Sequence, residues 1–407
     1  MRIAFVNHTE KWGGVKTWCL DMAAAFAAAG HSASLYGRDA LFLGRAAALG
    51  LEAHARPGGM DYHPLSIAAY VRAFRQSGVE AVVVNVGKDV RTAGIAARLL
   101  GLPVIRHVGA PWDFRDSLQV RLDHALVRPA FLCCSRYVLE GIVRRVPHVR
   151  NFPHAAIHPG TPLPPERPAP ENDPPRLVTT SRLSGDKRHA DLLGALVLLR
   201  GRGFSPALDI VGAGPEEAAL KGFVRDNDLE GQVRFHGFSS SVAEYLDRAD
   251  IFVLPSRCEP LGIALEEGMA HGLVPVARKA GGVPEIWPDG LGDLLLPEEA
   301  GPGDFARCLE AILLWPRERR LAVRDMVRRT ARERFSRQGQ FQAFARWLFS
   351  LAGRPAGPSP PSGQAPGSSA VRPGEEDSRP GRQPGPEGRG LIPSCLQTRL
   401  NARRQSF

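Results

Sequence analysis

The sequence predicts an α/β protein built from two doubly wound parallel-sheet domains. In the first half, short apolar and β-branched runs alternate with segments of helical length, at residues 2–6, 81–86, 103–108 and 131–134. Such alternation is typical of parallel strands joined by helices. Prolines interrupt it over residues 159–175, because proline excludes both helix interiors and central strands. The alternation then restarts in five further runs, at residues 176–181, 207–214, 233–238, 249–256 and 273–278.

The 407 residues, of which 43% are hydrophobic, are enough for two separate cores. The tail is rich in Pro, Gly and Ser, so it cannot bury enough apolar surface to offset its own ordering entropy, and we expect it to be disordered. We predict an N-terminal domain over 1–160, a proline-rich linker over 161–175, a C-terminal domain over 176–331, a C-terminal helix over 332–351 that crosses back, and the tail over 352–407.

Composition and charge narrow the class of protein. The net charge of +10 comes largely from arginine, but the basic block at 317–337 also contains acids, which favours a solvated helix face over a nucleic-acid surface. A basic excess favours contact with phosphates, on a nucleotide or on an anionic membrane. The six cysteines lack metal-site spacing, and no apolar run fits a signal peptide or a membrane span. We therefore expect a cytoplasmic protein, soluble or peripheral on the inner face of the cytoplasmic membrane.

Two groups of residues after predicted strands suit phosphate. Gly13 and Gly14 precede an alanine-rich helix, whose free amide groups and dipole favour an anion, although a tight turn also explains paired glycines. Arg182 and Lys187 follow the run 176–181 and suit a diphosphate, because arginine supplies a planar fork of donors and lysine a compact charge. Ordinary surface solvation is the alternative.

The segment "VGAGP", which begins at Val211 and contains Gly212, is similar to a dinucleotide-binding fingerprint. The third glycine of that fingerprint falls at Glu217. The hypothesis of a nicotinamide cofactor therefore loses its main support.

Three carboxylates, Glu259, Glu266 and Glu267, follow the apolar run 249–256. Glu266 and Glu267 point about a quarter-turn apart on a helix, so the three acids cannot all serve one ligand. Glu267 is placed to accept both hydrogen bonds from a ribose diol, and Glu259, in the loop, to meet a sugar. The alternative is that Glu266 and Glu267 are ordinary first-turn acids favoured by the helix dipole.

Together these motifs resemble one family. Glu259 and Glu267 lie within "CEPLGIALEEGMAHGLVPVARKAGGVPE", which resembles the signature of the family 4 glycosyltransferases (glycosyl transferases group 1), retaining enzymes of the GT-B fold. The segments "SRLSGDKRHADLL", "IVGAGPEEAAL", "VRFHGF" and the N-terminal Gly-Gly-Val accompany it in the family's order, so the resemblance covers residues 1 to about 350. It implies two Rossmann-like domains facing across a cleft, with the C-terminal helix packing back on the N-terminal domain.

The resemblance also implies roles for individual residues. Arg182 and Lys187 match positions that hold the donor's diphosphate, Glu267 the position that binds ribose, and Glu259 the position against the transferred sugar. His107, which follows the strand "PVIR", matches a histidine that lines the sugar site, and with Glu259, Arg182 and Lys187 it completes the expected catalytic set. Glu266 is expected to be a bystander. The other expected donor-binding positions are Gly13, Gly14, Gly212, Gly237, Phe238, Pro260, Leu261 and Gly262.

The chain departs from the family pattern at a few positions. Leu261 replaces a usual phenylalanine, Arg188 stands where glycine is common, and Val108 replaces the aspartate that often follows the histidine. None of these changes removes a charged donor-binding group.

The function implied by the resemblance is a retaining, metal-independent glycosyltransferase of the hexosyltransferase type, without cofactor and without a nucleic-acid partner. It would move a sugar from a nucleotide-sugar donor to a hydroxyl on a glycan, a lipid-linked acceptor or a small molecule, in bacterial polysaccharide, lipopolysaccharide or glycolipid synthesis. No residue is expected to act as a covalent nucleophile. The alternatives are a non-catalytic nucleotide-sugar-binding scaffold and a sugar-nucleotide epimerase of the same fold.

Overall fold

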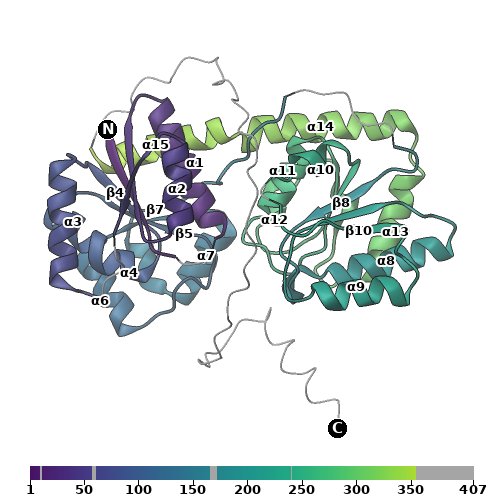
Figure 1. Ribbon diagram of the computed structural model, residues 1–407, viewed down its shortest axis with the longest axis horizontal. Helices are drawn as coiled ribbons and strands as arrows, with labels where there is room; N and C mark the ends of the chain where they lie inside the picture. The colour runs from purple at the N-terminus through teal and green to yellow at the C-terminus, as the bar shows by residue number, and fades with distance from the viewer. Residues whose placement is uncertain (10–11, 57–60, 166–171, 240, 354–407) are drawn as a thin grey trace, which may run out of the picture. The chain divides into compact units, whose positions relative to one another are not determined.

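The computed structural model describes residues 1–9, 12–56, 61–165, 172–239 and 241–353. Two parallel sheets organise these residues, one in each half of the chain (Figure 1). The predicted α/β class with two doubly wound parallel sheets is therefore confirmed. The expected disorder of the tail concerns residues that, from 354 onward, lie outside the described part of the chain, and the predicted segment boundaries stay predictions.

The N-terminal sheet has seven strands in the order β3-β2-β1-β4-β5-β6-β7, and its neighbouring strands pair in parallel. Its central strand β4 reads Ala-Val-Val-Val and is buried along its whole length, as expected for a strand covered by helices on both faces. The strands are β1 (Arg2–Asn7), β2 (Ser32–Gly37), β3 (Glu52–Ala55), β4 (Ala81–Val84), β5 (Val104–Val108), β6 (Ala130–Cys133) and β7 (His154–Ala156).

Helices cover both faces of this sheet. On one face, Phe5 of β1 packs in a cluster with residues of α1, α2 and α15. On the other face, Val84 packs with residues of α3, η1 and α5, and α6 and α7 continue that layer. The N-terminal helices are α1 (Gly14–Ala28), α2 (Ala40–Ala48), α3 (Pro64–Gln76), α4 (Gly87–Asp89), the π-helix η1 (Val90–Gly94), α5 (Ile95–Leu99), α6 (Leu118–Val127), α7 (Arg136–Arg145) and the 3-10 helix η2 (Pro147–Asn151).

The C-terminal sheet has six strands in the order β10-β9-β8-β11-β12-β13, again paired in parallel. Its strands are β8 (Leu177–Thr180), β9 (Leu208–Val211), β10 (Val233–Phe235), β11 (Ile251–Leu254), β12 (Val274–Arg278) and β13 (Leu295–Leu296). Its helices are η3 (Gly185–Lys187), α8 (His189–Gly201), α9 (Glu217–Asp226), α10 (Ala243–Asp247), α11 (Ile263–Ala270), α12 (Val283–Ile286), η4 (Gly292–Leu294), α13 (Pro302–Leu313) and α14 (Arg317–Phe335). One continuous hydrophobic core joins the sheet and its helices.

The last described helix, α15 (Arg337–Leu351), follows α14 after a single residue, Ser336, whose hydroxyl accepts a hydrogen bond from Gly339 N. Phe341, Phe344 and Leu348 of α15 are buried in the core of the N-terminal sheet. The expected packing of the C-terminal helix back on the N-terminal half is therefore confirmed.

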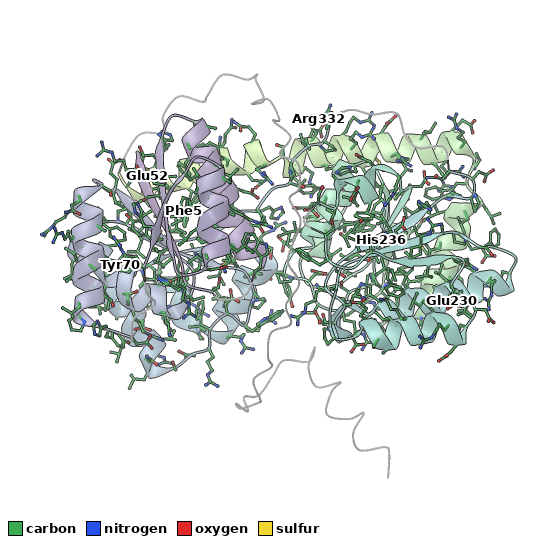
Figure 2. All side chains as sticks on the ribbon, in the orientation of Figure 1. Phe5, Glu52, Tyr70, Glu230, His236 and Arg332 are labelled. Carbon is green, nitrogen blue, oxygen red and sulfur yellow. The ribbon has the colours of Figure 1, made fainter. Side chains whose placement is uncertain are left out.

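Side-chain burial follows this architecture. Phe5 is fully buried between β1 and the helices, whereas Glu230 and Arg332 are exposed at the surface (Figure 2). Four strands escaped the sequence prediction: β2, β3, β7 and β13. Of these, β3 and β7 carry partly or fully exposed residues rather than apolar runs, because they form the two edges of the N-terminal sheet.

Candidate functional site

The candidate site lies where the strand order of the C-terminal sheet reverses direction. The chain runs outward from β8 to β9 and β10, and then returns to the other side of β8 to form β11. Such a switch point opens a crevice beyond the carboxyl ends of the two central strands, where ligands of open α/β sheets bind. Arg182 follows β8 and Glu259 follows β11, so the sheet itself brings these two loops together.

Lys187 and Glu259 meet in this crevice although 72 residues separate them. The Lys187 Nζ atom lies 2.7 Å from Glu259 Oε1 and 3.5 Å from the carbonyl oxygen of Cys258. The side chains are 18% and 10% exposed, so the ion pair is partly shielded from water. Arg182 is exposed, and its side chain forms no hydrogen bond or ion pair with the residues that the structure describes.

Two glycines that the sequence analysis did not single out hold the Glu259 loop in place. A Cβ atom at Gly281 would lie 2.0 Å from the carbonyl oxygen of Glu259, and one at Gly282 would lie 2.4 Å from that of Pro260. The amide of Gly282 donates a hydrogen bond to Glu259 O at 3.0 Å. Since only glycine fits this close approach, these positions belong to the site, and the Gly-Gly pair after β12 was the available sequence signal.

Two of the predicted donor-binding positions, Gly212 and Gly237, are neighbours in the structure. The amide of Gly212 donates to the carbonyl oxygen of Gly237 at 2.7 Å. Gly212 has a φ of +146°, and a Cβ atom there would lie 1.9 Å from the carbonyl oxygen of Ser181. Phe238 follows with a 72% exposed side chain. The two loops after β9 and β10 therefore form one closely packed wall beside the Arg182 loop.

The three remaining loop positions lead into α11. Leu261 is 2% exposed and contributes to the C-terminal core. Gly262 adopts the left-handed region with a φ of +108° and precedes the first helical residue. The carbonyl oxygen of Pro260 accepts a hydrogen bond of 2.6 Å from the hydroxyl of Ser135, the residue before α7. The loop is thus fixed from the N-terminal half as well.

Glu266 and Glu267 lie in different surroundings on α11. Glu266 is fully buried, and neither carboxyl oxygen has a hydrogen-bond partner among the described residues. Burial raises its pKa well above the usual value, and the charge of Glu267 adds to this shift. His158 Nδ1 lies 3.7 Å from Glu266 Oε1. A protonated, uncharged Glu266 fits this environment.

Glu267 has a pKa raised to about 7, mainly by burial, with Arg337 lowering it and Asp21 raising it. Arg337 NH2 lies 3.0 Å from Asp21 Oδ2, so part of the positive charge near Glu267 is already paired. The carboxyl therefore titrates near neutral pH, and a ligand that donates hydrogen bonds to it would favour the charged form.

In the N-terminal half, Gly13 and Gly14 begin α1, directly after β1 and beside the switch point between β1 and β4. Among the described residues, no side chain caps the first turn of α1, so its first amides can bind an anion. A Cβ atom on Gly14 would lie 3.8 Å from Ile263 Cδ1. The glycine loop and the start of α11 are therefore neighbours.

His107 requires a correction, because it lies inside β5 rather than after a strand. Its ring stacks on Trp18 at 4.0 Å with parallel planes, and its Nδ1 lies 3.3 Å from Asn85 Oδ1. Burial lowers its pKa to about 3, so the imidazole is neutral. The other ring nitrogen, Nε2, is buried without a hydrogen-bond partner among the described residues. Whether this atom meets the sugar stays a prediction.

Glu285 is a further residue that sequence reasoning missed. Its carboxylate accepts hydrogen bonds from the amides of Arg136 and Tyr137, at 2.8 and 2.6 Å, which are free first-turn donors of α7. His158 Nε2 lies 3.6 Å from the same carboxylate. Burial raises the pKa of the Glu285 carboxyl, but His158 and the two amide hydrogen bonds together bring this pKa below its usual value. Glu285 therefore links α12, which follows β12, to the start of α7.

A metal would need a cluster of His, Cys, Asp or Glu side chains. Within the described ranges, no group of three or more such side chains is placed to hold one. The sequence does contain one Asp-x-Asp triplet, Asp226 to Asp228, and it lies at the end of α9. Independence from metal stays a prediction that only a chelation assay can test.

Comparison with solved structures identifies the fold as that of the GT-B glycosyltransferases. A glycosyltransferase from Rickettsia africae aligns with a TM-score of 0.75, covering 86% of this chain and 98% of that one at 14% identity. Anabaena HepE in complex with UDP and glucose aligns with a TM-score of 0.70, covering 86% and 100% at 19% identity. At these identities, the likeness concerns the fold alone.

The sequence comparison finds glycosyltransferases among the similar proteins. Residues 174–314 match the model of the glycosyl transferases group 1, so this segment of the chain is similar to that family. The amylovoran biosynthesis glycosyltransferase AmsK of Erwinia amylovora is 36% identical over 151 residues, which is 35% of this chain and 36% of AmsK. The putative colanic acid biosynthesis glycosyltransferase WcaL of Salmonella typhimurium is 30% identical over 186 residues, 44% of this chain and 45% of WcaL. The matches thus span less than half the length of these relatives.

Proposed function

We propose that this protein is a retaining glycosyltransferase that moves a sugar from a nucleotide-sugar donor to a hydroxyl acceptor. The observation that carries the proposal is the Lys187–Glu259 pair at the strand-order reversal of the C-terminal sheet, within the segment that matches the family. A cation for phosphate and a carboxylate for sugar hydroxyls lie side by side there, as a bound sugar diphosphate requires. The GT-B fold supports the same conclusion.

Cleavage of the bond between sugar and diphosphate separates charge, and the proposed residues would stabilise both the negative and the positive charge. As the bond from the sugar to the diphosphate breaks, negative charge builds on the phosphate oxygens and positive charge on the sugar. Arg182 and Lys187 would stabilise the leaving diphosphate, and Glu259 the sugar. The acceptor oxygen forms the new bond to the sugar, and its proton passes to the leaving phosphate. Glu267 would accept hydrogen bonds from the ribose.

The proposal includes independence from a metal, because two basic side chains would supply the charge stabilisation that a divalent cation supplies elsewhere. It also includes bacterial cell-surface polysaccharide or lipopolysaccharide synthesis as the context. AmsK, WcaL and the lipopolysaccharide core biosynthesis glycosyltransferase LpsE of Rhizobium meliloti support that part, by the pathways in their names. A cytoplasmic location, where nucleotide sugars are made, goes with it.

The first test is binding. Thermal unfolding of the purified protein would be followed against a panel of nucleoside diphosphates and their sugar conjugates, since a ligand that binds only the native state raises stability. We expect one nucleotide to stabilise the protein, and Lys187→Met to remove the effect. Lys221→Met is the matched control, because Lys221 forms an exposed pair with Glu217 at the same 2.7 Å in the same half of the chain.

The second test is transfer. With the donor identified, release of nucleoside diphosphate and the anomeric configuration of the new glycoside would be measured with and without EDTA. Retained configuration and unchanged rate in EDTA are the expected results. An inverted product would overturn the retaining mechanism, and a rate lost in EDTA and restored by Mg²⁺ would overturn metal independence.

The two alternatives give different outcomes in the same experiments. A scaffold would bind a nucleotide sugar but release no nucleoside diphosphate with any acceptor. An epimerase would convert the donor to its epimer without acceptor. Release of nucleoside diphosphate decides between the transferase and the scaffold, because binding alone already uses the charged groups at Arg182, Lys187 and Glu259.

A further inference from the structure

We propose that the outer surface of α3, α5 and α6 in the N-terminal half docks on an anionic lipid bilayer. This surface lies on the face of the sheet opposite to α1, α2 and α15, and α5 packs against both α3 and α6 within it. The inference deepens the proposed function, since a lipid-linked acceptor is met at a membrane, but the contact with lipid does not depend on transfer activity.

Large apolar side chains gather on this surface. Leucines of the three helices project into solvent: Leu65 is 75% exposed, Leu99 67%, Leu118 74%, Leu122 58% and Leu126 52%. Leu118, Leu122 and Leu126 recur every four residues along α6, so they form one stripe on that helix. Single exposed leucines are normal on a protein surface, whereas a contiguous set such as the α6 stripe marks an interaction site.

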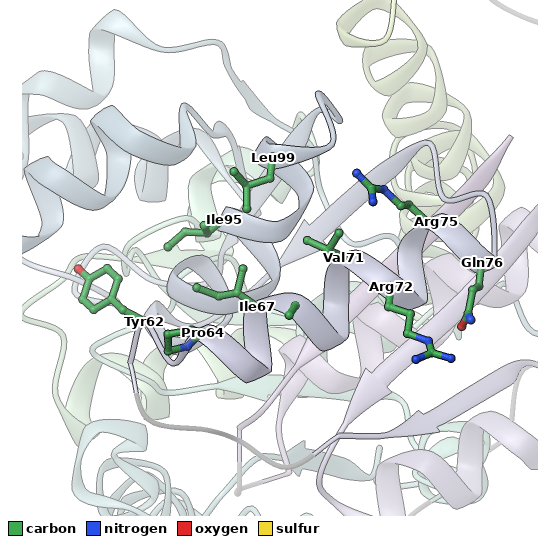
Figure 3. A pocket seen from close by; sticks show the side chains of 10 residues that line it. Tyr62, Pro64, Ile67, Val71, Arg72, Arg75, Gln76, Ile95 and Leu99 are labelled. Carbon is green, nitrogen blue, oxygen red and sulfur yellow. The ribbon is translucent and has the colours of Figure 1, made fainter.

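An apolar groove of about 730 Å³ runs between α3 and α5. Figure 3 shows Ile67 and Val71 of α3 and Ile95 and Leu99 of α5 along the groove, with Tyr62 at one end. Long polar side chains, including Arg72 and Arg75, lie at the other end. The groove therefore has an apolar body and a cationic end, the arrangement needed by a lipid chain and its phosphate.

Every exposed charge on the three helices is positive. The exposed charged residues of α3, α5 and α6 are Arg72, Arg75, Arg98 and Arg121. Asp123, the acid within these helices, is buried and bound to Arg91. Arg121 pairs with Asp116. The side chains of Arg72, Arg75 and Arg98 form no ion pair or hydrogen bond with any residue of the described ranges, so they are available to anionic headgroups.

Two aromatic residues border the surface. Tyr62, before α3, is 40% exposed, and Trp112, before α6, is 41% exposed. Tyrosine and tryptophan favour the boundary between headgroups and acyl chains, because each joins an apolar ring to a polar atom. No helix in the described part of the chain is long and apolar enough to cross a bilayer, so the contact that we propose is peripheral.

Charge decides between a bilayer and a second copy of this chain as the occupant. In a two-fold symmetric dimer the same surface would meet itself, so Arg72, Arg75 and Arg98 would face helices that offer no exposed carboxylate to pair with. An anionic bilayer offers apolar depth for the leucines and phosphate oxygens for the arginines.

The test is sedimentation of the full chain with vesicles of phosphatidylcholine alone and of phosphatidylcholine mixed with phosphatidylglycerol. We expect binding to the mixed vesicles only. Removing the three arginines together, as Arg72→Gln, Arg75→Gln and Arg98→Gln, should weaken partitioning by about a hundredfold, at roughly fivefold for each charge. The double variant Leu122→Gln and Leu126→Gln should also lose binding, and glutamine keeps the helix propensity.

Two control variants remove the same number of arginines or leucines from surfaces outside α3, α5 and α6. Arg225→Gln, Arg234→Gln and Arg329→Gln remove three exposed arginines from the C-terminal half, and Leu41→Gln with Leu49→Gln removes two exposed leucines near α2. Both control sets should bind vesicles as the unchanged protein does.

Three outcomes would overturn the proposal: no binding of the unchanged chain to either vesicle, equal loss in the control sets, or a dimer in solution that the Leu122→Gln and Leu126→Gln variant abolishes. Nucleotide-induced thermal stabilisation, measured on the same samples, separates failure here from failure of the proposed function, because these variants lie outside the donor site.

Discussion

The raised pKa of Glu267 makes the stability of this protein depend on pH in an unusual direction. The pKa of the carboxyl is about 7 in the folded chain, against an ordinary value of 4.5 for glutamate. Between these two values the folded state binds more protons than the unfolded state, so the free energy of unfolding falls as pH rises. The stability associated with the protonated carboxyl is fully present below pH 4.5 and is lost as pH rises to about 7.

The size of the effect follows from the shift. One pKa unit corresponds to about 1.4 kcal/mol, so Glu267 should lower the free energy of unfolding by about 2–3 kcal/mol between pH 5 and pH 8. Glu267→Gln removes the titration, and its pH dependence should be flatter by that amount. Urea unfolding at several pH values measures it, with the exposed Glu298→Gln as the control. Parallel pH profiles of the unchanged and Glu267→Gln proteins would refute the reasoning.

The same carboxyl links nucleotide binding to proton release. If the ribose donates hydrogen bonds to an ionised Glu267, a nucleoside diphosphate that binds at pH 6 should displace almost one proton from this site, and almost none at pH 8.5. Calorimetry in buffers of different ionisation enthalpy counts the protons. The difference between the unchanged and Glu267→Gln proteins isolates this carboxyl from the titrating phosphate. A difference of zero at pH 6 would contradict the ribose role.

Three further predictions concern single residues. Asp191→Ala should cost about 3–5 kcal/mol in urea unfolding, because it leaves the fully buried Arg278, 2.7 Å away, without its carboxylate. Gly282→Ala should weaken nucleotide-sugar binding in the thermal assay, because its Cβ atom would lie 2.4 Å from a carbonyl oxygen of the loop that carries Glu259. Glu259→Gln should bind a nucleoside diphosphate up to about fivefold more tightly in calorimetry, because Lys187 loses a competing partner worth about 1 kcal/mol, while the transfer rate falls.

Each of these variants has a control in the same half of the chain. Glu217→Ala breaks the exposed pair with Lys221 and should cost under about 0.5 kcal/mol, and a similar cost for Asp191→Ala would contradict the burial argument. Gly292→Ala introduces a Cβ atom that meets nothing within 4 Å, so it should leave binding unchanged. Weaker nucleotide binding in Glu259→Gln would show that the carboxylate does not compete for Lys187.

The central strands were predictable because burial on both faces selects continuous apolar runs. Ala81–Val84 and Ile251–Leu254 are buried at every position, and both runs stand out in the sequence. The strand Glu52–Ala55 reads Glu-Ala-His-Ala, with no fully buried residue, and an edge strand of this kind carries no apolar signal. Exposure therefore explains why β3 and β7 were missed. The strand β2 is buried at every position except Ser32, and it was missed because Ser-Ala-Ser-Leu-Tyr-Gly is not a continuous apolar run.

Parallel topology made the location of the site predictable, but not the contacts between its side chains. Residues after parallel strands share one edge of a sheet, so the placement of Arg182, Lys187 and Glu259 in one region followed from their order. The ion pair itself did not follow, because it depends on how the loops after β8 and β11 fold. The stacking of His107 on Trp18 was equally hidden, since it depends on which face of β5 each side chain meets.

Both sheets reverse their strand order at one place, and the proposed donor groups divide between these two places. In the N-terminal sheet the reversal lies at β1 and β4, where Gly13 and Gly14 begin a helix with uncapped amides. In the C-terminal sheet it lies at β8 and β11, where Lys187 meets Glu259. A diphosphate needs donors from several directions, which one crevice rarely supplies. A Cβ atom on Gly14 would lie 3.8 Å from Ile263 Cδ1, so the two sets of loops are neighbours. We therefore expect one donor to engage amides from the first half and side chains from the second.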